Sequence, residues 1–426
     1  LLASLLVSVQ ITAHSRLVMD SRSPRKKWLI SLLYLASLAG TVCLIQTLIA
    51  TRLIIGRQPI SIKKKPGLPL RFGSDGTFKI LQVADMHYAN GLITRCRDVF
   101  PSEFDYCSDQ NTTQFLHKVI EAEKPDLVAF TGDNIFGAST SDAAESLFGA
   151  FGPVIKSQIP WAAILGNHDH ESTMTREELM SLISLMDYSV SRTNPSDADS
   201  CNPSKGQHLS TCIDGFGNYD VSVYGACGSH LANTSVLNLF FLDSGDRSIV
   251  NGIPTYGWIK ESQLRWVQSI SQNFEVLKEK RKHSSHSSEV IPPPALAFFH
   301  IPIPEVRQLY SQKFVGQFQE AVACSFVNSG VLKIFCSMGV VKAVFMGHDH
   351  ANDFCGNIEG IWFCYGGGFG YHGYGRPGWH RRARIILAEL EKGENEWLGV
   401  ERIRTWKRLD NEKLGKLDEQ ILWETQ

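Results

Sequence analysis

Seven imidazole, carboxylate and amide side chains in this sequence follow short apolar runs, at the points where buried strands would end. These residues are Asp85, His87, Asp133, Asn167, His300, His348 and His350. Such oxygen and nitrogen donors suit borderline and hard cations, here iron, zinc or manganese. One ion does not need so many ligands, so the set predicts two cations that share a carboxylate. A pair of this kind holds a phosphate ester and converts a bridging water into hydroxide.

No single motif in this set is specific by itself. Asp-x-His at Asp85 occurs often by chance on protein surfaces, and Gly-Asn at Asn167 is common in turns. A lone histidine such as His300 is more often a core residue than a ligand. The combination is specific because every motif lies at a predicted strand end. Five other histidines follow no such run and are incidental: His117, His208, His230, His283 and His286.

Eight apolar runs predict strands, which indicates an α/β domain. They cover residues 78–85, 126–134, 159–170, 235–246, 294–302, 341–350, 358–368 and 382–390. Buried strands read as continuous Val, Ile, Leu and Phe runs, and ligands collect at the carboxyl ends of strands in layered α/β folds. The segment 111–125 predicts a helix, with Phe115 and Val119 at helical spacing and Pro125 as its stop.

The bulk composition is that of an ordinary globular protein. The chain has 426 residues, a formal net charge of −1, 43% hydrophobic residues and 20% charged residues. Near-zero net charge argues against a nucleic-acid partner bound by bulk electrostatics. Candidate ligands lie on both sides of the loop-like segments 194–206 and 278–294, so neither separates two domains. We expect one catalytic domain over 76–410, after a linker at 52–75 and before a C-terminal tail at 411–426.

An uncharged apolar segment near the N-terminus predicts that the chain is inserted into a membrane. Residues 28–51 are long enough to cross a bilayer as a helix, and the basic residues before them favour a signal anchor with a cytosolic N-terminus. Basic residues also follow, so the charge asymmetry is weak and a cleaved signal peptide is the alternative. Residues 1–27 are then a cytosolic segment, of which 1–18 read as sequence upstream of a start at Met19.

Cysteine spacing also favours the secretory pathway. Three pairs lie close together in the sequence: Cys96 with Cys107, Cys201 with Cys212, and Cys355 with Cys364. These spacings fit disulfides formed in an oxidising compartment and match no zinc-finger pattern. Of the ten cysteines, Cys43 lies in the apolar segment, so an odd number remains and at least one should be free. Asn111 and Asn233 begin glycosylation sequons. We expect an extracellular or lumenal protein.

The ordered motifs together resemble the calcineurin-like metallophosphoesterase superfamily. They read "DMH", "GDN", "GNHD", a single histidine and "GHDH", and the resemblance covers the chain after residue 76. Flanking stretches such as "AEKPDLVAFTGDNIFG", "FMGHDHANDFCG" and "CYGGGFGYHGYG" are most similar to short, single-domain plant purple acid phosphatases of the type called "probable inactive purple acid phosphatase 29". The implied fold is α/β, with two packed β-sheets flanked by helices in four layers, α/β/β/α.

The resemblance implies a role for each residue. The implied metal ligands are Asp85, His87 and His350 for the first ion, Asn167, His300 and His348 for the second, and Asp133 as the bridge. His168 would face the leaving-group oxygen as general acid or phosphate contact, and Asp169 would orient it. In the glycine-rich stretch 364–375, Tyr371 and His372 are candidate substrate contacts, with packing over the core as an equal alternative.

Phe136 departs from the pattern of the purple enzymes. Those carry a tyrosine three residues after the bridging aspartate, whose phenolate binds ferric iron and gives the colour, and they have glycine where this chain has His87. We therefore expect no visible charge-transfer band and less preference for Fe(III). The implied activity is acid-phosphatase-like hydrolysis of phosphomonoesters. The alternatives are a catalytically silent relative that binds metal or phosphate, and a phosphodiesterase or pyrophosphatase that uses the same site.

Overall fold

The computed structural model describes residues 24–54, 63–194, 213–282, 292–394 and 396–425, and it divides the chain into two units, Leu1–Ile62 and Lys63–Gln426. The described part of the first unit is one helix, α2 (Pro24–Ile54). Its stretch Trp28–Thr47 has a mean hydropathy of 2.1, and none of that stretch is buried. By length and composition this helix is able to cross a membrane, and a signal sequence has the same properties.

The second unit contains a six-stranded sheet in the order β15-β14-β13-β1-β2-β3. Its strands are β1 (Thr77–Val83), β2 (Leu127–Thr131), β3 (Trp161–Ile164), β13 (Arg382–Lys392), β14 (Trp397–Leu409) and β15 (Lys416–Glu424). Strands β1, β2 and β3 are parallel, whereas β13, β14 and β15 form an antiparallel meander. The segment 411–426, predicted to be a tail, thus contains β15. The strand was not predicted because its sequence is rich in charged residues. A strand at the edge of a sheet tolerates such residues, since one of its sides faces solvent.

A seven-stranded sheet faces the first one, in the order β4-β5-β8-β10-β12-β11-β9. Its strands are β4 (Tyr219–Tyr224), β5 (Ser235–Phe241), β8 (Ala295–Phe298), β9 (Phe314–Val315), β10 (Val341–Met346), β11 (Cys355–Ile358) and β12 (Ile361–Tyr365). The four central strands β5, β8, β10 and β12 are parallel. A separate hairpin is formed by β6 (Arg247–Val250) and β7 (Ile253–Tyr256). The predicted strands are therefore present, and they divide between two sheets.

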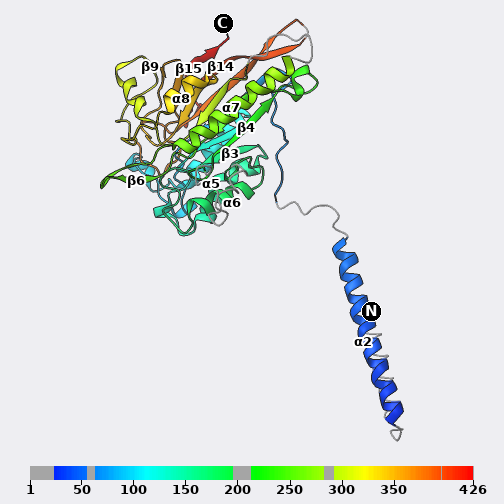
Figure 1. Ribbon diagram of the computed structural model, residues 1–426. Coiled ribbons are helices and arrows are strands. Elements are labelled where there is room, and N and C mark those ends of the chain that lie inside the picture. Colours follow the sequence, from blue (N-terminus) through cyan, green and yellow to red (C-terminus); the bar gives the residue numbers. More distant parts are fainter. Residues whose placement is uncertain (1–23, 55–62, 195–212, 283–291, 395, 426) are drawn as a thin grey trace. The chain divides into compact units, whose positions relative to one another are not determined.

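Helices cover the outer faces of the sheets. The α-helices of this unit are α3 (Pro101–Phe104), α4 (Asp109–Glu123), α5 (Ala143–Lys156), α6 (Arg176–Leu185), α7 (Glu261–Lys282) and α8 (Val331–Met338). Helices α4 to α6 pack in sequence and connect or follow the parallel strands β1 to β3, and α7 packs on α8 beside the other sheet. In Figure 1, α7 and α8 lie together, apart from α5 and α6. The predicted four-layer α/β/β/α arrangement is confirmed.

Aromatic side chains fill the space between the sheets. Four of them stand in one row across β4, β5, β8 and β10, with neighbouring ring centroids 4.9, 4.8 and 5.4 Å apart: Tyr219, Phe241, Phe298 and Phe345. The Tyr219 hydroxyl donates to the Ala163 carbonyl of β3, 2.8 Å away in the opposite sheet. Similarly, Gln82 of β1 donates to the Met346 carbonyl of β10 at 2.9 Å. This packing fixes the two sets of parallel strand ends relative to one another.

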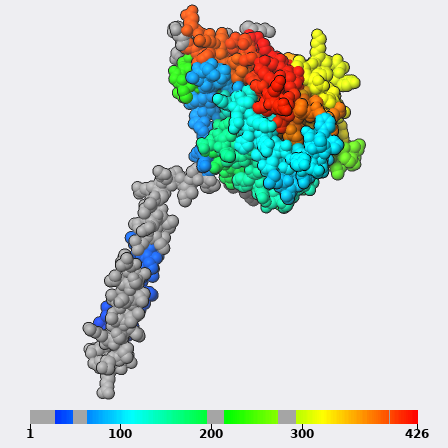
Figure 2. Space-filling view, turned by 180° about the vertical axis from the view of Figure 1, so that it is seen from behind, coloured from blue at the N-terminus to red at the C-terminus, as the bar shows by residue number. Residues whose placement is uncertain are grey.

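The C-terminal strands also meet the first helices of the domain. Figure 2 shows the cyan segment around residue 100 beside the red C-terminal strands. Glu123 at the end of α4 is buried and pairs with Arg408 of β14 at 2.6 Å, and Lys118 pairs with Asp410 at 3.3 Å. The meander β13 to β15 is thereby tied to the part of the sheet that carries the first motif.

The cysteine prediction is confirmed for two pairs. Cys96–Cys107 and Cys355–Cys364 are disulfides, and the second joins directly opposite positions of β11 and β12. Cys201 and Cys212 lie outside the described residues. Four other cysteines are free: Cys43, Cys227, Cys324 and Cys336. Of the two sequon asparagines, Asn233 is exposed, whereas Asn111 is half-buried and accepts a hydrogen bond from Ser108 at the start of α4.

Asp109, the first residue of α4, links this helix to the loop after β1. It is fully buried, and its Oδ2 accepts hydrogen bonds from the backbone N–H groups of Ala89 and Gly91 at 2.8 and 3.1 Å. Its Oδ1 has no partner among the described residues. Burial raises the pKa of Asp109 to about 7, against the hydrogen bonds that lower it. The folded protein therefore holds a proton here that the unfolded chain releases near pH 4.

We expect Asp109→Asn to stabilise the protein at pH 8. Between about pH 4 and 7 the native carboxyl binds more protons than the unfolded one, so its contribution to stability falls as pH rises. The amide keeps an acceptor for both N–H groups and never ionises. Melting temperatures of the two proteins should converge near pH 4, separate progressively up to about pH 7, and differ most at pH 8. Asp105→Asn, at an exposed position between α3 and α4, is the matched control. If the melting temperatures of Asp109→Asn and the parent protein fall equally as the pH rises, this explanation is excluded.

Candidate metal centre

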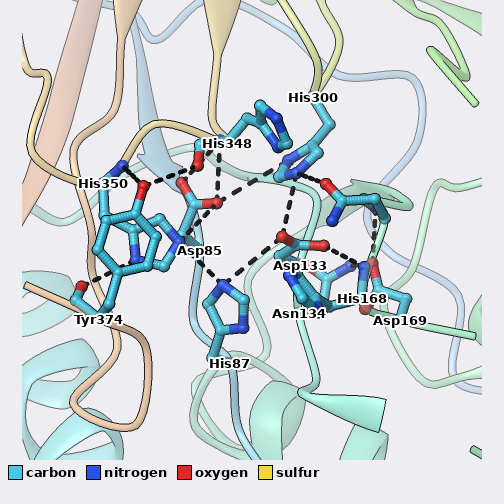
Figure 3. Close-up of polar contacts among 12 residues, drawn as sticks. Asp85, His87, Asp133, Asn134, His168, Asp169, His300, His348, His350 and Tyr374 are labelled. Atoms are coloured by element: carbon cyan, nitrogen blue, oxygen red, sulfur yellow. Dashed lines mark hydrogen bonds and ion pairs between the residues drawn. The ribbon is translucent and has the colours of Figure 1, made fainter. Parts of the chain in front are cut away.

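The predicted ligands lie directly after parallel strands of both sheets. Asp85 follows β1, Asp133 follows β2, Asn167 and His168 follow β3, His300 follows β8, and His348 and His350 follow β10. Because the sheets pack face to face, the carboxyl ends of these strands open toward one place. Figure 3 shows these side chains pointing toward one another. All seven predicted ligand residues are buried.

One group of donors comes from four residues. Donor atoms of Asp85, His87, Asp133 and His350 all lie within 4.8 Å of one another. The Nε2 atoms of His87 and His350 are 2.9 Å apart, and each lies 3.5 Å from a carboxylate oxygen, of Asp133 and Asp85 respectively. Two carboxylates and two imidazoles around one point form a ligand set for a cation such as zinc, iron or manganese.

A second group shares one residue with the first. Donor atoms of Asp133, His300 and His348 also lie within 4.8 Å of one another. His300 Nε2 is 3.2 Å from Asp133 Oδ2 and 3.3 Å from the amide oxygen of Asn167. Asp133 is therefore the only residue common to the two groups that the described part of the chain forms. This is the position expected of a bridging carboxylate.

The protonation states of two of the histidines, His87 and His348, fit metal ligands. Burial, and then the neighbouring His350, holds the pKa of His87 well below its usual value, and burial does the same for His348. Neutral imidazole is the form that binds metal ions. The Nε2 atom of His348 is buried without a hydrogen-bond partner in the described structure. A buried nitrogen of this kind is costly unless a ligand satisfies it.

Asp133 is held in its ionised form. Burial alone would raise its pKa, but His300 and His87 outweigh burial and place it well below the usual value. The pKa of His300 is shifted in the opposite direction. Burial would lower it, but the carboxylates of Asp133 and Asp85 raise it to about 9. The ionised Asp133 carboxylate is thus stabilised by a protonated His300 ring, which has to release this proton before its nitrogen can bind a metal ion. We conclude that the residues present fit a pair of cations.

The backbone at the ligand positions is turned in an unusual way. Asp85, His87, Asp133 and His348 have φ angles of 56°, 45°, 48° and 81°. Residues other than glycine are uncommon in this left-handed region, and such residues cluster at functional sites. The neighbouring Gly166 is required for close approach, because a Cβ there would lie 2.1 Å from Asp133 Oδ1. These turns direct several donors inward within a few residues of each strand end.

Backbone groups orient the ligands. Asp85 accepts hydrogen bonds from the His348 N–H at 2.9 and 3.1 Å, and Asp133 Oδ1 accepts one from the His168 N–H at 2.7 Å. His300 Nδ1 lies 2.9 Å from the Thr131 carbonyl. Partners of this kind fix ring orientation and leave the other ring nitrogen for a metal.

Tyr374 is a site residue that the sequence did not reveal. Its ring stacks on His350 with centroids 3.8 Å apart, and its carbonyl oxygen lies 2.9 Å from His350 Nδ1. Its hydroxyl reaches Glu320 at 3.0 Å. The signal was weak, because one tyrosine among several in a glycine-rich stretch has no distinguishing neighbour. Tyr374 holds the imidazole of His350 in place (Figure 3).

The other two aromatic candidates of this stretch lie farther out. The Tyr371 hydroxyl donates to Asp410 at 2.8 Å, and Tyr371 has no described contact with the ligand residues. The His372 ring hydrogen-bonds to the Arg95 carbonyl and the Ser139 hydroxyl at 2.8 and 3.0 Å. It also packs against Phe136, at a centroid distance of 5.5 Å. His372 thus lies behind the wall of the site, and Tyr371 belongs to the contact with the C-terminal strands.

His168 lies beside the ligands, and its partner differs from the predicted one. Its Nδ1 is 2.8 Å from Glu171 Oε2, and its side chain is 24% exposed. Asp169, predicted to orient His168, instead accepts hydrogen bonds from Ile135 and Gly166 N–H groups at 3.0 and 2.7 Å and is fully buried. The side chains of His168 and Asp169 point in different directions. Asp169 therefore links the loops after β2 and β3, and Glu171 contacts the His168 imidazole instead.

Phe136 and Arg247 complete the surroundings of His168. The Phe136 ring is 4.9 Å from the His168 ring and 5.3 Å from the His87 ring, so a phenyl group stands next to the first donor group. Arg247, from the hairpin strand β6, contacts Glu171 at 2.5 Å and the Asn167 carbonyl at 3.1 Å. Its Nη2 lies 3.4 Å from His168 Nε2. The half-exposed guanidinium places a positive charge at the mouth of the site.

Comparisons with known proteins agree with this chemistry. Residues 78–352 match the family model described as calcineurin-like phosphoesterase. The chain is 62% identical to "Probable inactive purple acid phosphatase 28" of Arabidopsis thaliana, over 93% of this chain and 97% of that protein. It is 49% identical to "Probable inactive purple acid phosphatase 29" of the same plant, over 83% of this chain and 88% of that protein. "Phosphatase DCR2" of Saccharomyces cerevisiae is 34% identical, over 79% and 54% respectively.

We expect Asp133→Asn to lower the affinity for both ions by at least about 100-fold, because loss of supporting residues alone costs 10- to 100-fold. Titration calorimetry with Mn²⁺ or Zn²⁺ on metal-stripped protein measures the change. Added metal should raise the melting temperature of the parent protein and leave that of the variant unchanged. Asp214→Asn, an exposed acid on the same domain, is the control. Two unaltered binding events in Asp133→Asn would disprove the shared-ligand arrangement.

We expect protein loaded with Fe(III) to show no charge-transfer band in the visible range, since Phe136 has no phenolate. Phe136→Tyr places a hydroxyl beside the first donor group and should produce such a band. Absorption spectra of the two iron-loaded proteins test this directly. A visible band in the parent protein would mean that another tyrosine binds the ion.

Proposed function

Because this chain belongs to the calcineurin-like phosphoesterase family, we propose that it hydrolyses phosphomonoesters at this centre. The observation that supports the proposal most is the place of Asp133 in both donor groups. Two bound cations supply Lewis-acid chemistry, which neutralises phosphate charge and activates water. We propose the ligand roles as predicted: Asp85, His87 and His350 for one ion, Asn167, His300 and His348 for the other, and Asp133 for both.

His168 is the proposed general acid. Its Nδ1 is occupied by Glu171 at 2.8 Å, and its Nε2, which lies 3.4 Å from Arg247 Nη2, would face a substrate oxygen. Its backbone N–H donates to Asp133, so the imidazole is fixed relative to the shared ligand. The Glu171 carboxylate beside Nδ1 also fixes the orientation of the ring. Proton delivery of this kind to a leaving oxygen contributes about 10²- to 10⁴-fold to rate.

Arg247 is the proposed phosphate contact. Glu171 and the Asn167 carbonyl hold its Nη1, and its Nη2 lies beside His168. A guanidinium has several donors in a plane, which matches the oxygens of a phosphate group. Its side chain is 49% exposed, so an incoming ester can reach it. Arg247 would orient the phosphate so that the ester oxygen faces His168.

A catalytically silent protein that binds metal or phosphate is the second candidate. Two relatives from Arabidopsis thaliana carry the word "inactive" in their names. Against this, the yeast relative is named a phosphatase, and every expected ligand position here bears a donor side chain. Phe136 removes a phenolate, whereas His87 supplies an imidazole at the same group. The proposed metal centre therefore does not need the missing tyrosine.

We also propose a place in the secretory pathway. The two disulfides and the apolar helix α2 support export. The catalytic domain, near residues 76–410 with its sheet extended by β15, would then lie in the lumen or outside the cell, anchored by residues 28–51 if these are retained. Asn233, exposed before β5, is a suitable glycosylation site, and Asn111 is a poorer one because its side chain caps α4.

We expect the metal-loaded protein to hydrolyse phenyl phosphate and Asp133→Asn to lose that activity while its circular dichroism spectrum is preserved. His168→Asn should lower kcat by about 10²-fold or more for an alkyl phosphate, and by less for 4-nitrophenyl phosphate, whose leaving group needs no proton. His230→Asn, at an exposed histidine, is the control. If neither the parent protein nor Asp133→Asn hydrolyses phenyl phosphate with zinc, manganese or iron, the second candidate, a protein that binds metal or phosphate without catalysis, is favoured. A diester turned over faster than its monoester would favour a phosphodiesterase.

A further inference from the structure

The wall of the site beyond the proposed general acid carries a second arginine. Phe136 packs against His168 and His87, with centroid distances of 4.9 and 5.3 Å. The guanidinium carbon of Arg97 lies 5.8 Å from the centroid of the Phe136 ring. The Phe136 ring therefore contacts both the proposed general acid His168 and the guanidinium of Arg97.

The charge of Arg97 is not matched by a carboxylate. Arg247, the first arginine at the site, forms an ion pair with Glu171 at 2.5 Å. Arg97 is exposed and forms no ion pair with any residue that the structure describes; its described side-chain contact is the Phe136 ring. An exposed guanidinium beside an aromatic ring remains free to bind an anion with its edge.

The backbone holds Arg97 firmly. The Cys96–Cys107 disulfide closes the loop immediately before it. The Arg97 N–H donates to the Tyr371 carbonyl at 2.8 Å, and the Arg97 carbonyl accepts from Arg381 Nη2 at 3.0 Å. Its neighbour Asp98 accepts a hydrogen bond from the Gly375 N–H at 3.0 Å. The loop is thus fixed to the glycine-rich stretch, and little backbone freedom is lost when a ligand binds.

We propose that Arg97 binds a second anionic group carried by the leaving group, so that the preferred substrates are phosphomonoesters with a further carboxylate or phosphate. This inference rests on the proposed function, because His168 defines the direction of the leaving group. The hydrolysed phosphate would lie at the cations and Arg247. The second anion would lie at Arg97, and the part of the molecule between them would pass over Phe136.

Non-hydrolysable ligands test the inference apart from catalysis. Calorimetry on the metal-loaded full-length protein compares phenylphosphonate with 4-phosphonobenzoate and benzene-1,4-diphosphonate. We expect the two ligands that carry a second anionic group to bind about fivefold more tightly than phenylphosphonate, as an exposed ion pair allows, and this advantage to shrink at high salt. If 4-phosphonobenzoate shows the larger gain in affinity, a carboxylate is the better second anion; if benzene-1,4-diphosphonate does, a phosphate is. Arg97→Gln should bring the ratio close to one.

Arg95→Gln is the matched control. Arg95 lies on the same loop with the same charge, but its Nη1 donates to the Asp105 carbonyl at 2.6 Å. It should keep the preference. Equal affinity of the parent protein for all three ligands, or an equal loss in both variants, would overturn the inference. Selective binding without hydrolysis of phenyl phosphate would overturn only the proposed function, and failure to bind any phosphonate would overturn both.

Discussion

A buried carboxylate placed between two groups of imidazoles is the constraint on which this structure depends. Asp133 is 1% exposed, and an ionised carboxylate in such a place is tolerated only if cations or donors surround it. His300, His87 and the His168 N–H serve that need in the protein itself. The left-handed turn at Asp133 and the absence of a side chain at Gly166 allow this approach. Neither sheet could supply the whole environment, since His87 follows β1 and His300 follows β8.

Strands and ligands were predictable from the sequence for the same physical reason. A strand buried on both faces has almost no polar residues, so the first polar residue marks the place where the chain reaches solvent or a ligand. Asp85, Asp133, Asn167, His300 and His348 all carry that signal. The weakest part of the prediction lay at the C-terminus, where β15 (KLDEQILWE) contains four charged residues and lies at a sheet edge. An edge strand of this kind reads like a polar tail.

Residues that act through another side chain were harder to find. Asp169 follows His168 directly, yet it faces the loop after β2, and Glu171 three residues on meets the imidazole. Tyr374 and Tyr371 are similar in sequence context, and only the path of the glycine-rich stretch decides which one stacks on His350. Which side chain makes the contact depends on χ angles and loop geometry, and the spacing of residues in the sequence does not determine either. Arg97 and Arg247 were missed because arginine is not a metal ligand and neither residue belongs to one of the ligand motifs.

The division of the ligands between the two sheets has a consequence for biogenesis. The donors begin at Asp85 on the first strand and end at His350, which lies after β10 in the last quarter of the domain. A nascent chain that has only its first three strands outside the ribosome presents Asp85, His87 and Asp133 without the imidazoles of the opposite sheet. High-affinity capture of cations must therefore be a late event, completed after the sandwich has closed. The ions would then act as cross-links that hold the two sheets together at their open edge.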